Sequence, residues 1–263
     1  MEGPGRMSDE SLARIQARLE PFEGWRLWHL DRVVSTQDSL REALEQGEPE
    51  HLALSAGIQT GGRGRHGRSW NQEPEEDLAL SVLLRPAGRY PPLLLPFLLP
   101  AALYEALGTM AVPRQKLRIK WPNDLLLDEK KIAGVLIEGD GSGAYLCGIG
   151  CNVGRRSFPE ELRGRASSLR LEGLEQTSYP QLLEVLLLEL ARMLSEAEKG
   201  DWSRVLHSYA QGFRYLGEEV VVETGEGGIH GRLESLGPQG IRLDQGACLD
   251  PGQVLAIRRL VDP

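Results

Sequence analysis

Lysine is scarce in this sequence, and an excess of positive charge is absent. Only five of the 30 basic residues are lysines, and four of those five lie between positions 116 and 131. The formal net charge of −8 argues against a surface built throughout for nucleic acid, so any anion-binding site must be local. Because lysine supplies a compact, mobile ammonium that arginine lacks, the clustering favours a need for lysine chemistry in this segment.

Cysteine is also rare, and no targeting segment is recognisable. The three thiols, Cys147, Cys151 and Cys248, are odd in number and show no metal-binding spacing. We expect all three to be buried and reduced, which is usual for free cysteine in a reducing compartment. Residues 1–9 are polar and contain no signal-peptide core. These absences together predict a cytoplasmic location.

No long apolar run is uninterrupted. The most apolar segment, 93–110, contains Pro96, Pro100 and Glu105, so we interpret it as a buried helix and not as a membrane span. With 41% hydrophobic and 26% charged residues, the chain has the composition of a soluble globular protein. Its 263 residues suffice for one large domain, or for a domain with a small satellite.

Hydrophobic periodicity predicts two regions of different character. In residues 1–212, strands and helices alternate without a strict βαβ rhythm, which predicts an α+β fold with a mixed, mostly antiparallel sheet. The expected helices are 8–19, 36–45, 93–110, 179–198 and 201–211, and the expected strands are 25–34, 51–58, 78–84, 117–121, 125–128, 131–138 and 144–149. Residues 213–263 contain short β segments separated by glycine turns, which predict a small β-barrel.

A loop rich in glycine and arginine follows the second expected strand. Residues 61–70 read GGRGRHGRSW, with glycine at four of the first seven positions. Glycines let the backbone approach a ligand closely, and the arginines donate to phosphate or carboxylate oxygens. The pattern predicts an anion-binding loop that is mobile until its ligand binds. An RGG-like nucleic-acid tract or a solvated turn is the alternative, and neither a Walker A motif nor GxGxxG is present.

Polar residues also gather at three strand ends. Residues 120–124 read KWPND, where proline stops the strand and Asp124 is a candidate Mg²⁺ ligand beside nucleotide phosphates. An ordinary hairpin with charged ends is the alternative. Residues 35–38 read STQD, whose hydroxyls suit either a helix cap or a polar ligand. Residues 148–152 read GIGCN, whose glycines admit close packing or a ligand.

In this order, the four motifs resemble those of the biotin–protein ligase (holocarboxylase synthetase) family. The resemblance is carried by STQD at 35–38, GRGRHGRSW at 62–70, KWPNDLLLDEKKIAGVLIE at 120–138 and GIGCNV at 148–153. It implies a catalytic domain (1–212) related to class II aminoacyl-tRNA synthetases and an SH3-like domain (213–263). It also implies that biotin, ATP and Mg²⁺ give biotinyl-5′-AMP, and that biotin then passes to a lysine of a biotin carboxyl carrier protein.

The resemblance further implies roles for individual residues. Those implied to bind biotin are Ser35, Thr36, Gln37, Gln59, Gly62, Arg63, Gly64, Arg65, Lys131, Gly134 and Gly150. Those implied to bind the nucleotide are Arg63, Arg65, Arg68, Trp70, Lys120, Asn123, Lys131 and Asn152, with Trp70 stacked on adenine. Lys131, Arg65 and Lys120 are the implied catalytic cations, and Asp124 is the implied metal ligand.

Two positions depart from the family pattern. Gln37 stands where asparagine is usual, and His66 stands where arginine is frequent. A longer amide still donates and accepts, so we expect its contact with the ureido ring to persist with altered geometry. His66 carries less fixed charge at neutral pH. Neither change removes a group that the chemistry needs.

Other interpretations remain open from the sequence. A lipoate–protein ligase has the same scaffold, and a non-enzymatic biotin sensor or a nucleic-acid-binding module are further alternatives. About 24 residues precede the first expected strand, too few for the winged-helix domain of the family's repressors, so we expect no DNA binding. A homodimer through the core sheet is implied by the resemblance alone.

Overall fold

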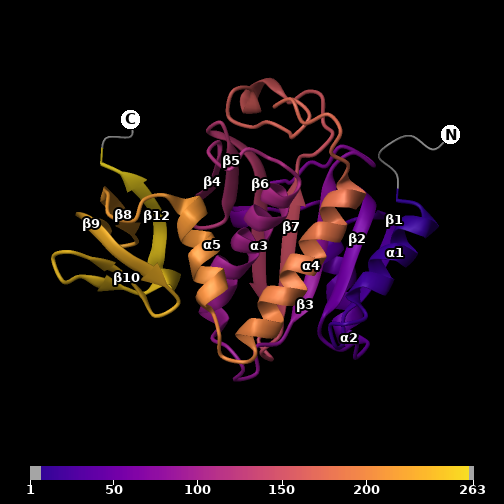
Figure 1. Cartoon of the computed structure of the whole chain (residues 1–263), viewed down its shortest axis with the longest axis horizontal. Coiled ribbons are helices and arrows are strands. Elements are labelled where there is room, and N and C mark those ends of the chain that lie inside the picture. The colour runs from indigo at the N-terminus through magenta and orange to yellow at the C-terminus, as the bar shows by residue number, and fades with distance from the viewer. Residues whose placement is uncertain (1–6, 261–263) are drawn as a thin grey trace.

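The computed structural model describes residues 7–260, which form a seven-stranded sheet, a layer of helices and a smaller sheet (Figure 1). The main sheet has the strand order β1-β2-β3-β7-β6-β5-β4, and every neighbouring pair is antiparallel except β1 and β2. Its strands are β1 (Arg26–Val33), β2 (Leu52–Gln59), β3 (Leu78–Leu84), β4 (Leu117–Lys120), β5 (Asp124–Leu127), β6 (Lys130–Gly139) and β7 (Tyr145–Cys151). The α+β expectation with a mostly antiparallel sheet is confirmed.

Helices cover both faces of this sheet. The α-helices are α1 (Asp9–Leu19), α2 (Thr36–Glu45), α3 (Leu95–Thr109), α4 (Tyr179–Ala197) and α5 (Ser203–Phe213). Helices α3, α4 and α5 pack together across one face (Figure 1). On β2, Ala53 belongs to their large core, whereas Leu52 and Leu54 belong to a smaller cluster with Leu40 of α2. Because side chains alternate along a strand, this split places α2 on the opposite face.

The strand β3 lies in the interior of the sheet, between β2 and β7, and is buried along its whole length. Its sequence, LALSVLL, lacks the polar alternation of a strand with one solvated face, since both of its faces are covered. Ser81 is the single polar residue in the strand and is fully buried. A buried hydroxyl needs a hydrogen-bonding partner, and Ser81 finds its partners at the amino end of α2.

The apolar segment around α3 is a core helix of this fold. Residues Pro92–Thr109 are long and apolar enough to cross a membrane by length and composition, but 67% of them are buried inside the structure. The helix contacts α4, α5 and three strands of the main sheet. Its apolar character on all sides therefore follows from being enclosed by protein.

Residues 219–259 form a five-stranded antiparallel sheet with the order β11-β10-β9-β8-β12. Its strands are β8 (Glu219–Thr224), β9 (Gly227–Gly237), β10 (Gly240–Leu243), β11 (Cys248–Leu249) and β12 (Val254–Arg259). It lies beyond α5, at the β4 end of the main sheet (Figure 1). Trp121 joins the two regions, because its Nε1 donates to the carbonyl oxygen of Val254 at 2.9 Å.

The amino ends of α2 and α5 are satisfied in different ways. Helix α5 has Trp202 as its N-cap residue, and Asp201 accepts from the backbone N–H of Ser203 at 3.0 Å from one position earlier. Ser35 occupies the N-cap position of α2, but its side chain makes no capping hydrogen bond. The backbone N–H of Thr36 instead donates to Gln59 Oε1 at 2.9 Å. The polar groups at the start of α2 are thus tied to the end of β2.

The cysteines divide into two kinds, and the expectation that all three are buried is wrong for Cys248. Burial raises the pKa of the Cys147 and Cys151 thiols, which keeps both protonated. Cys248 is exposed, because it lies on the two-residue strand β11 at the edge of the small sheet. Burial and strand position distinguish Cys248 from Cys147 and Cys151, and the spacing of cysteines in the sequence reports neither.

We expect a thiol reagent such as Ellman's reagent to modify one cysteine in the native protein and all three after denaturation. Reactivity requires an accessible thiolate, which only Cys248 can supply among the three. The variant Cys248→Ser should show no rapid native reaction. Rapid labelling of two or three thiols in the folded wild-type protein would contradict the burial of Cys147 and Cys151.

Candidate active site

A cavity of about 640 Å³ opens beside the ends of the central strands and is lined by all four sequence motifs. Every residue that the resemblance assigned to biotin, nucleotide or metal lines it, except Gly62. Gly62 lies just beneath, where a Cβ atom would come within 2.4 Å of the Trp70 carbonyl oxygen. The fold thus brings together segments that are more than 100 residues apart in the sequence.

The glycine- and arginine-rich loop folds back on itself at the cavity. The backbone N–H of Gly64 donates to Arg68 O at 2.7 Å, and that of Trp70 donates to Gly62 O at 2.8 Å. Between them, His66 and Gly67 adopt positive φ values of 57° and 70°. Glycine takes this conformation without strain, and histidine is among the residues that adopt it more often than most, so the tight return is compatible with the sequence.

The indole of Trp70 packs on a floor made by two glycines. A Cβ atom at Gly150 would lie 2.3 Å from Trp70 Cε2, and one at Gly134 would lie 3.4 Å from Cζ3. Trp70 Nε1 is buried and has no hydrogen-bond partner among the described residues. Lys131 Nζ lies 5.7 Å from the centroid of the ring. A flat ring bound against glycine backbone is a surface on which another planar ring can stack.

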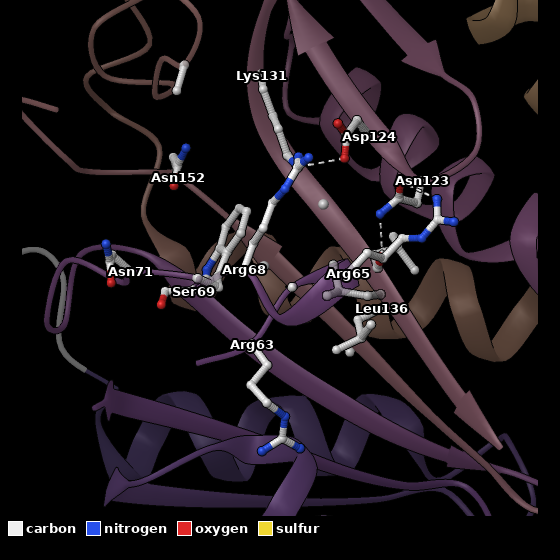
Figure 2. A pocket seen from close by; sticks show the side chains of 18 of the residues that line it. Arg63, Arg65, Arg68, Ser69, Asn71, Asn123, Asp124, Lys131, Leu136 and Asn152 are labelled. Atoms are coloured by element: carbon white, nitrogen blue, oxygen red, sulfur yellow. Dashed lines mark hydrogen bonds and ion pairs between the residues drawn. The ribbon is translucent and has the colours of Figure 1, made fainter. Parts of the chain in front are cut away.

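Lys131 is held at the start of β6 and paired with a carboxylate. Its Nζ lies 2.6 Å from Asp124 Oδ1 (Figure 2). Its backbone N–H donates to Arg165 O at 2.9 Å, and its carbonyl oxygen accepts from Ser167 at the same distance. The backbone is thus fixed on both sides, whereas the ammonium is retained only by a partner that an incoming anion can replace.

Arg65 and Asn123 connect the loop to the KWPND segment. Arg65 Nη1 donates to Asn123 Oδ1 at 3.4 Å, and Asn123 Nδ2 donates to Val135 O at 2.7 Å (Figure 2). The second bond fixes the amide, so that its oxygen faces the loop. Arg65 therefore spans the cavity between two predicted motifs.

Arg63 has a different environment from the other loop cations. Its guanidinium donates two hydrogen bonds, of 2.6 and 2.7 Å, to the Asp38 carboxylate, and Figure 2 shows it directed away from the other labelled cations. These bonds lower the pKa of the Asp38 carboxyl. Glu138 and Arg41 extend the cluster through a 3.0 Å ion pair. The Arg63 side chain thus anchors the loop to α2.

Four polar side chains form a connected network at the α2 end. Thr36 Oγ1 lies 2.8 Å from Ser81 Oγ and 3.2 Å from Gln59 Oε1. Ser81 Oγ donates to Gln37 Oε1 at 2.9 Å, and Gln37 Nε2 donates to Leu146 O at 3.2 Å. The Gln37 amide is thus buried against the sheet, and its contact with a ureido ring stays a prediction.

Sequence reasoning missed several residues of the site. Arg155 is 5% exposed, its Nε lies 3.2 Å from Asp77 Oδ2, and its Nη2 donates to Asn71 O at 2.5 Å. Burial raises the pKa of the Asp77 carboxyl, and backbone N–H groups and Arg155 oppose that rise. Residues 155–166, including Phe158, complete the cavity wall. Asp77 and Arg155 lie 78 positions apart in no recognisable motif, so only the fold shows that they belong together.

The cavity concentrates positive charge on a chain of negative net charge. The cations that line it include Arg65, Arg68, Lys120, Lys131 and Arg165. Positive charge is thus gathered locally, as an anion site on a chain of negative net charge would require. Within residues 7–260, no cysteine, serine or threonine at the cavity lies beside a histidine base in the hydrogen bonds described above. The cations of this cavity are placed where they could bind and orient an anionic ligand.

Comparisons with known proteins identify the family. Residues 30–154 match the model of the biotin/lipoate A/B protein ligase family. A biotin–[acetyl-CoA-carboxylase] ligase of Paracoccus denitrificans is 32% identical over 196 residues, which is 72% of this chain and 81% of that protein. A bifunctional ligase/repressor BirA of Bacillus subtilis is 29% identical over 252 residues, covering 91% of this chain and 75% of the relative.

A solved structure agrees with these relatives. The biotin protein ligase from Aquifex aeolicus in complex with biotin and ATP matches with a TM-score of 0.75 and 32% identity, covering 89% of this chain and 99% of that chain. The chain belongs to the biotin/lipoate A/B protein ligase family, among the biotin–protein ligases. The resemblance seen in the sequence is thereby confirmed.

Proposed function

We propose that this protein is an ATP-dependent biotin–protein ligase, which forms biotinyl-5′-AMP and transfers biotin to a lysine of a biotin carboxyl carrier protein. The observation that carries the proposal is the single cationic cavity in which Lys131, Arg65 and the glycine floor under Trp70 meet. The substrates named in the Aquifex structure, biotin and ATP, support this choice of ligands. The carrier named for the Paracoccus relative supports an acetyl-CoA carboxylase subunit as the acceptor.

In the first step the biotin carboxylate attacks the α-phosphorus of ATP. A carboxylate oxygen–phosphorus bond forms, the bond to the β-phosphate bridging oxygen breaks, and pyrophosphate leaves. Two anions must approach each other, so the barrier contains a large repulsive part. Lys131 exchanges its Asp124 partner for the reacting oxygens, and Arg65 approaches from the loop. Positioned cations stabilise the charge that develops in the transition state.

Mg²⁺ would enter this site together with the nucleotide. Asp124 supplies one carboxylate at the cavity, and no cluster of three or more His, Cys, Asp or Glu suited to a metal exists in residues 7–260. Phosphate oxygens and water would thus provide most of its ligands, as is usual for Mg²⁺ bound with nucleotides. The ion would supply neutralisation of phosphate charge.

In the second step the carrier lysine attacks the activated carbonyl of the adenylate. An amide bond forms, the acyl–phosphate bond breaks, and AMP leaves with the electron pair. The amine loses its proton as the amide forms. No protein nucleophile is needed, but water must be excluded between the two steps. The loop 61–70, anchored by Arg63 and Trp70, is the segment placed to do this.

Arg65→Gly is expected to loosen retention of the adenylate more than it slows its formation. The change removes the contact to Asn123 across the cavity and adds backbone freedom to the loop. We expect release of biotinyl-5′-AMP to become about tenfold faster, in the range of one charge-assisted hydrogen bond. Release is measured by rapid filtration of labelled adenylate, with His66→Gly as the control for added flexibility. Unchanged release from Arg65→Gly would contradict the shielding role of the loop.

The proposed function is tested by biotin-dependent exchange of labelled pyrophosphate into ATP. Exchange with biotin and not with lipoate supports the proposal, and exchange with lipoate alone would replace it by a lipoate ligase. Absence of exchange in the folded protein, with biotin still bound, would support a sensor. The expectation that the chain does not bind DNA stays a prediction, to be checked by operator binding at physiological salt.

A further inference from the structure

The two hydroxyls of Thr36 and Ser81 meet at the α2 end of the cavity, and the direction of the hydrogen bond between them is not obvious from distance alone. Their oxygens lie 2.8 Å apart, and either can donate. Both residues line the cavity and are buried, at 4% and 0% exposure. Each hydroxyl has one proton. The direction of the Thr36 proton therefore determines whether Thr36 offers a donor or a lone pair to a ligand in the cavity.

Gln37 settles this direction, because its amide has one possible orientation. Its nitrogen faces Leu146 O at 3.2 Å and Glu138 Oε2 at 3.3 Å. The Leu146 carbonyl oxygen is an acceptor, and so is the Glu138 carboxylate, which forms a 3.0 Å ion pair with Arg41. The amide oxygen must therefore face Ser81 Oγ, 2.9 Å away. A buried carbonyl oxygen needs a donor, and Ser81 is the donor that the structure places there.

With its proton committed to Gln37, Ser81 can only accept from Thr36. The remaining neighbour of Thr36 Oγ1 is Gln59 Oε1, at 3.2 Å. That oxygen already accepts from the backbone N–H of Thr36 at 2.9 Å, so it is an acceptor as well. The Thr36 proton thus points into the protein whichever oxygen it selects. What remains for the cavity is a lone pair of Thr36.

We propose that Ser81 is a positioning residue that sets the hydrogen-bond polarity of Thr36, so that this end of the cavity accepts an N–H and rejects an acceptor atom. The inference rests on the proposed function, in which the cyclic urea of biotin occupies this end. A cyclic urea has two N–H donors and one carbonyl acceptor. An oxygen in place of the facing N–H would set two lone pairs against each other, at almost unchanged size.

The test uses Ser81→Ala and two carbamate analogues of biotin, in each of which one of the two ureido N–H groups is replaced by oxygen. The readout is KM and kcat in pyrophosphate exchange with the full-length protein. We expect Ser81→Ala to raise KM for biotin about five- to tenfold and to change kcat less than about twofold, the size of one neutral hydrogen bond. KM for one carbamate isomer should change less than about twofold. Without Ser81, the only inward acceptor left for the Thr36 hydroxyl is Gln59 Oε1, at the longer distance of 3.2 Å and already bonded to the Thr36 backbone N–H, so the hydroxyl can turn toward the carbamate oxygen.

Two variants control for a purely structural effect. Ser55→Ala removes another fully buried serine hydroxyl, on the neighbouring strand β2, whose partner is His29 Nδ1 at 2.9 Å and which does not line the cavity. Ser55→Ala should leave the KM for biotin and the KM for that carbamate isomer unchanged. Ser81→Thr keeps the hydroxyl and should restore discrimination between biotin and the same carbamate isomer.

The outcomes separate this inference from the proposed function. If wild type shows no biotin-dependent exchange, the proposed function fails first. If wild type is active, and Ser81→Ala weakens biotin and both carbamates equally, Ser81 has a packing role and the polarity inference is overturned. A Ser81→Ala protein with unchanged KM for biotin overturns it as well. Loss of discrimination against one isomer only, rescued by threonine, supports it.

Discussion

Lys131→Met is expected to lower kcat for biotin-dependent pyrophosphate exchange about 100- to 1,000-fold, the effect of removing one positioned charge from a developing anion. The ammonium lies 2.6 Å from Asp124 Oδ1 and 5.7 Å from the centroid of the Trp70 ring, at the cavity. Methionine retains much of the length and apolar surface of lysine but no charge. The loss should therefore appear mainly in kcat, with a smaller rise in KM for ATP.

The adjacent lysine provides a matched control. Lys130 Nζ forms a 2.9 Å ion pair with Glu172, and Lys130 does not line the cavity. Lys130→Met removes the same charge from the same strand and should retain activity within about twofold, since surface ion pairs contribute little. Equal losses in both variants, or full activity of Lys131→Met with unchanged melting temperature, would contradict the catalytic role of Lys131.

The order of helices and strands along the chain was largely predictable, because long apolar patterns determine it. Helix α2 and strand β3 begin and end at the predicted residues, 36–45 and 78–84. Helix α2 has the periodicity of an amphipathic helix, whereas β3 is a short continuous apolar run between polar flanks. The strand β5 begins at Asp124 and not at 125, a shift that depends on its pairing with Lys120. Element boundaries depend on such partners, which a pattern along one segment does not contain.

The positions of the motifs were predictable, but their mutual contacts were not. The sequence placed Lys131 and Asp124 near each other at strand ends, but their 2.6 Å ion pair depends on the pairing of β5 with β6 and the register shift within it. Arg63 was expected at the ligand, whereas its guanidinium is bound by Asp38 of α2. Charged side chains select partners from all elements that surround them, and those elements are known only after folding.

Ser81 and Arg155 mark the limit of sequence reasoning more sharply. Ser81 is one small residue inside an apolar strand, and nothing in LALSVLL indicates that its hydroxyl meets Thr36 and Gln37. Arg155 follows the GIGCN segment by three positions, but its ion-pair partner is Asp77, which precedes β3. The role of a buried polar group depends on its partners in the folded structure, and the sequence around the group does not indicate which residues those partners are.

Gly150→Ala is expected to raise KM for ATP about 10- to 100-fold, in line with the effect of a displacement of about 1 Å in a site. The added Cβ atom would lie 2.3 Å from Trp70 Cε2, closer than any real contact, so the indole must leave its floor. Because Trp70 is proposed to stack on adenine, its displacement should weaken the binding of ATP more than the binding of biotin. Isothermal titration with each ligand separates the two effects.

Gly139→Ala is the matched control, because its Cβ atom would lie an ordinary 3.5 Å from Tyr145 in the same sheet. It should leave both ligands unaffected. The effect of Gly150→Ala should also depend on the ring that it displaces. In a Trp70→Ala background, which itself has a raised KM for ATP, the added methyl should raise that KM little further. Equal, additive losses in both backgrounds would show that the methyl acts on the strand and not through Trp70, and the glycine floor would then have no specific part in binding the nucleotide.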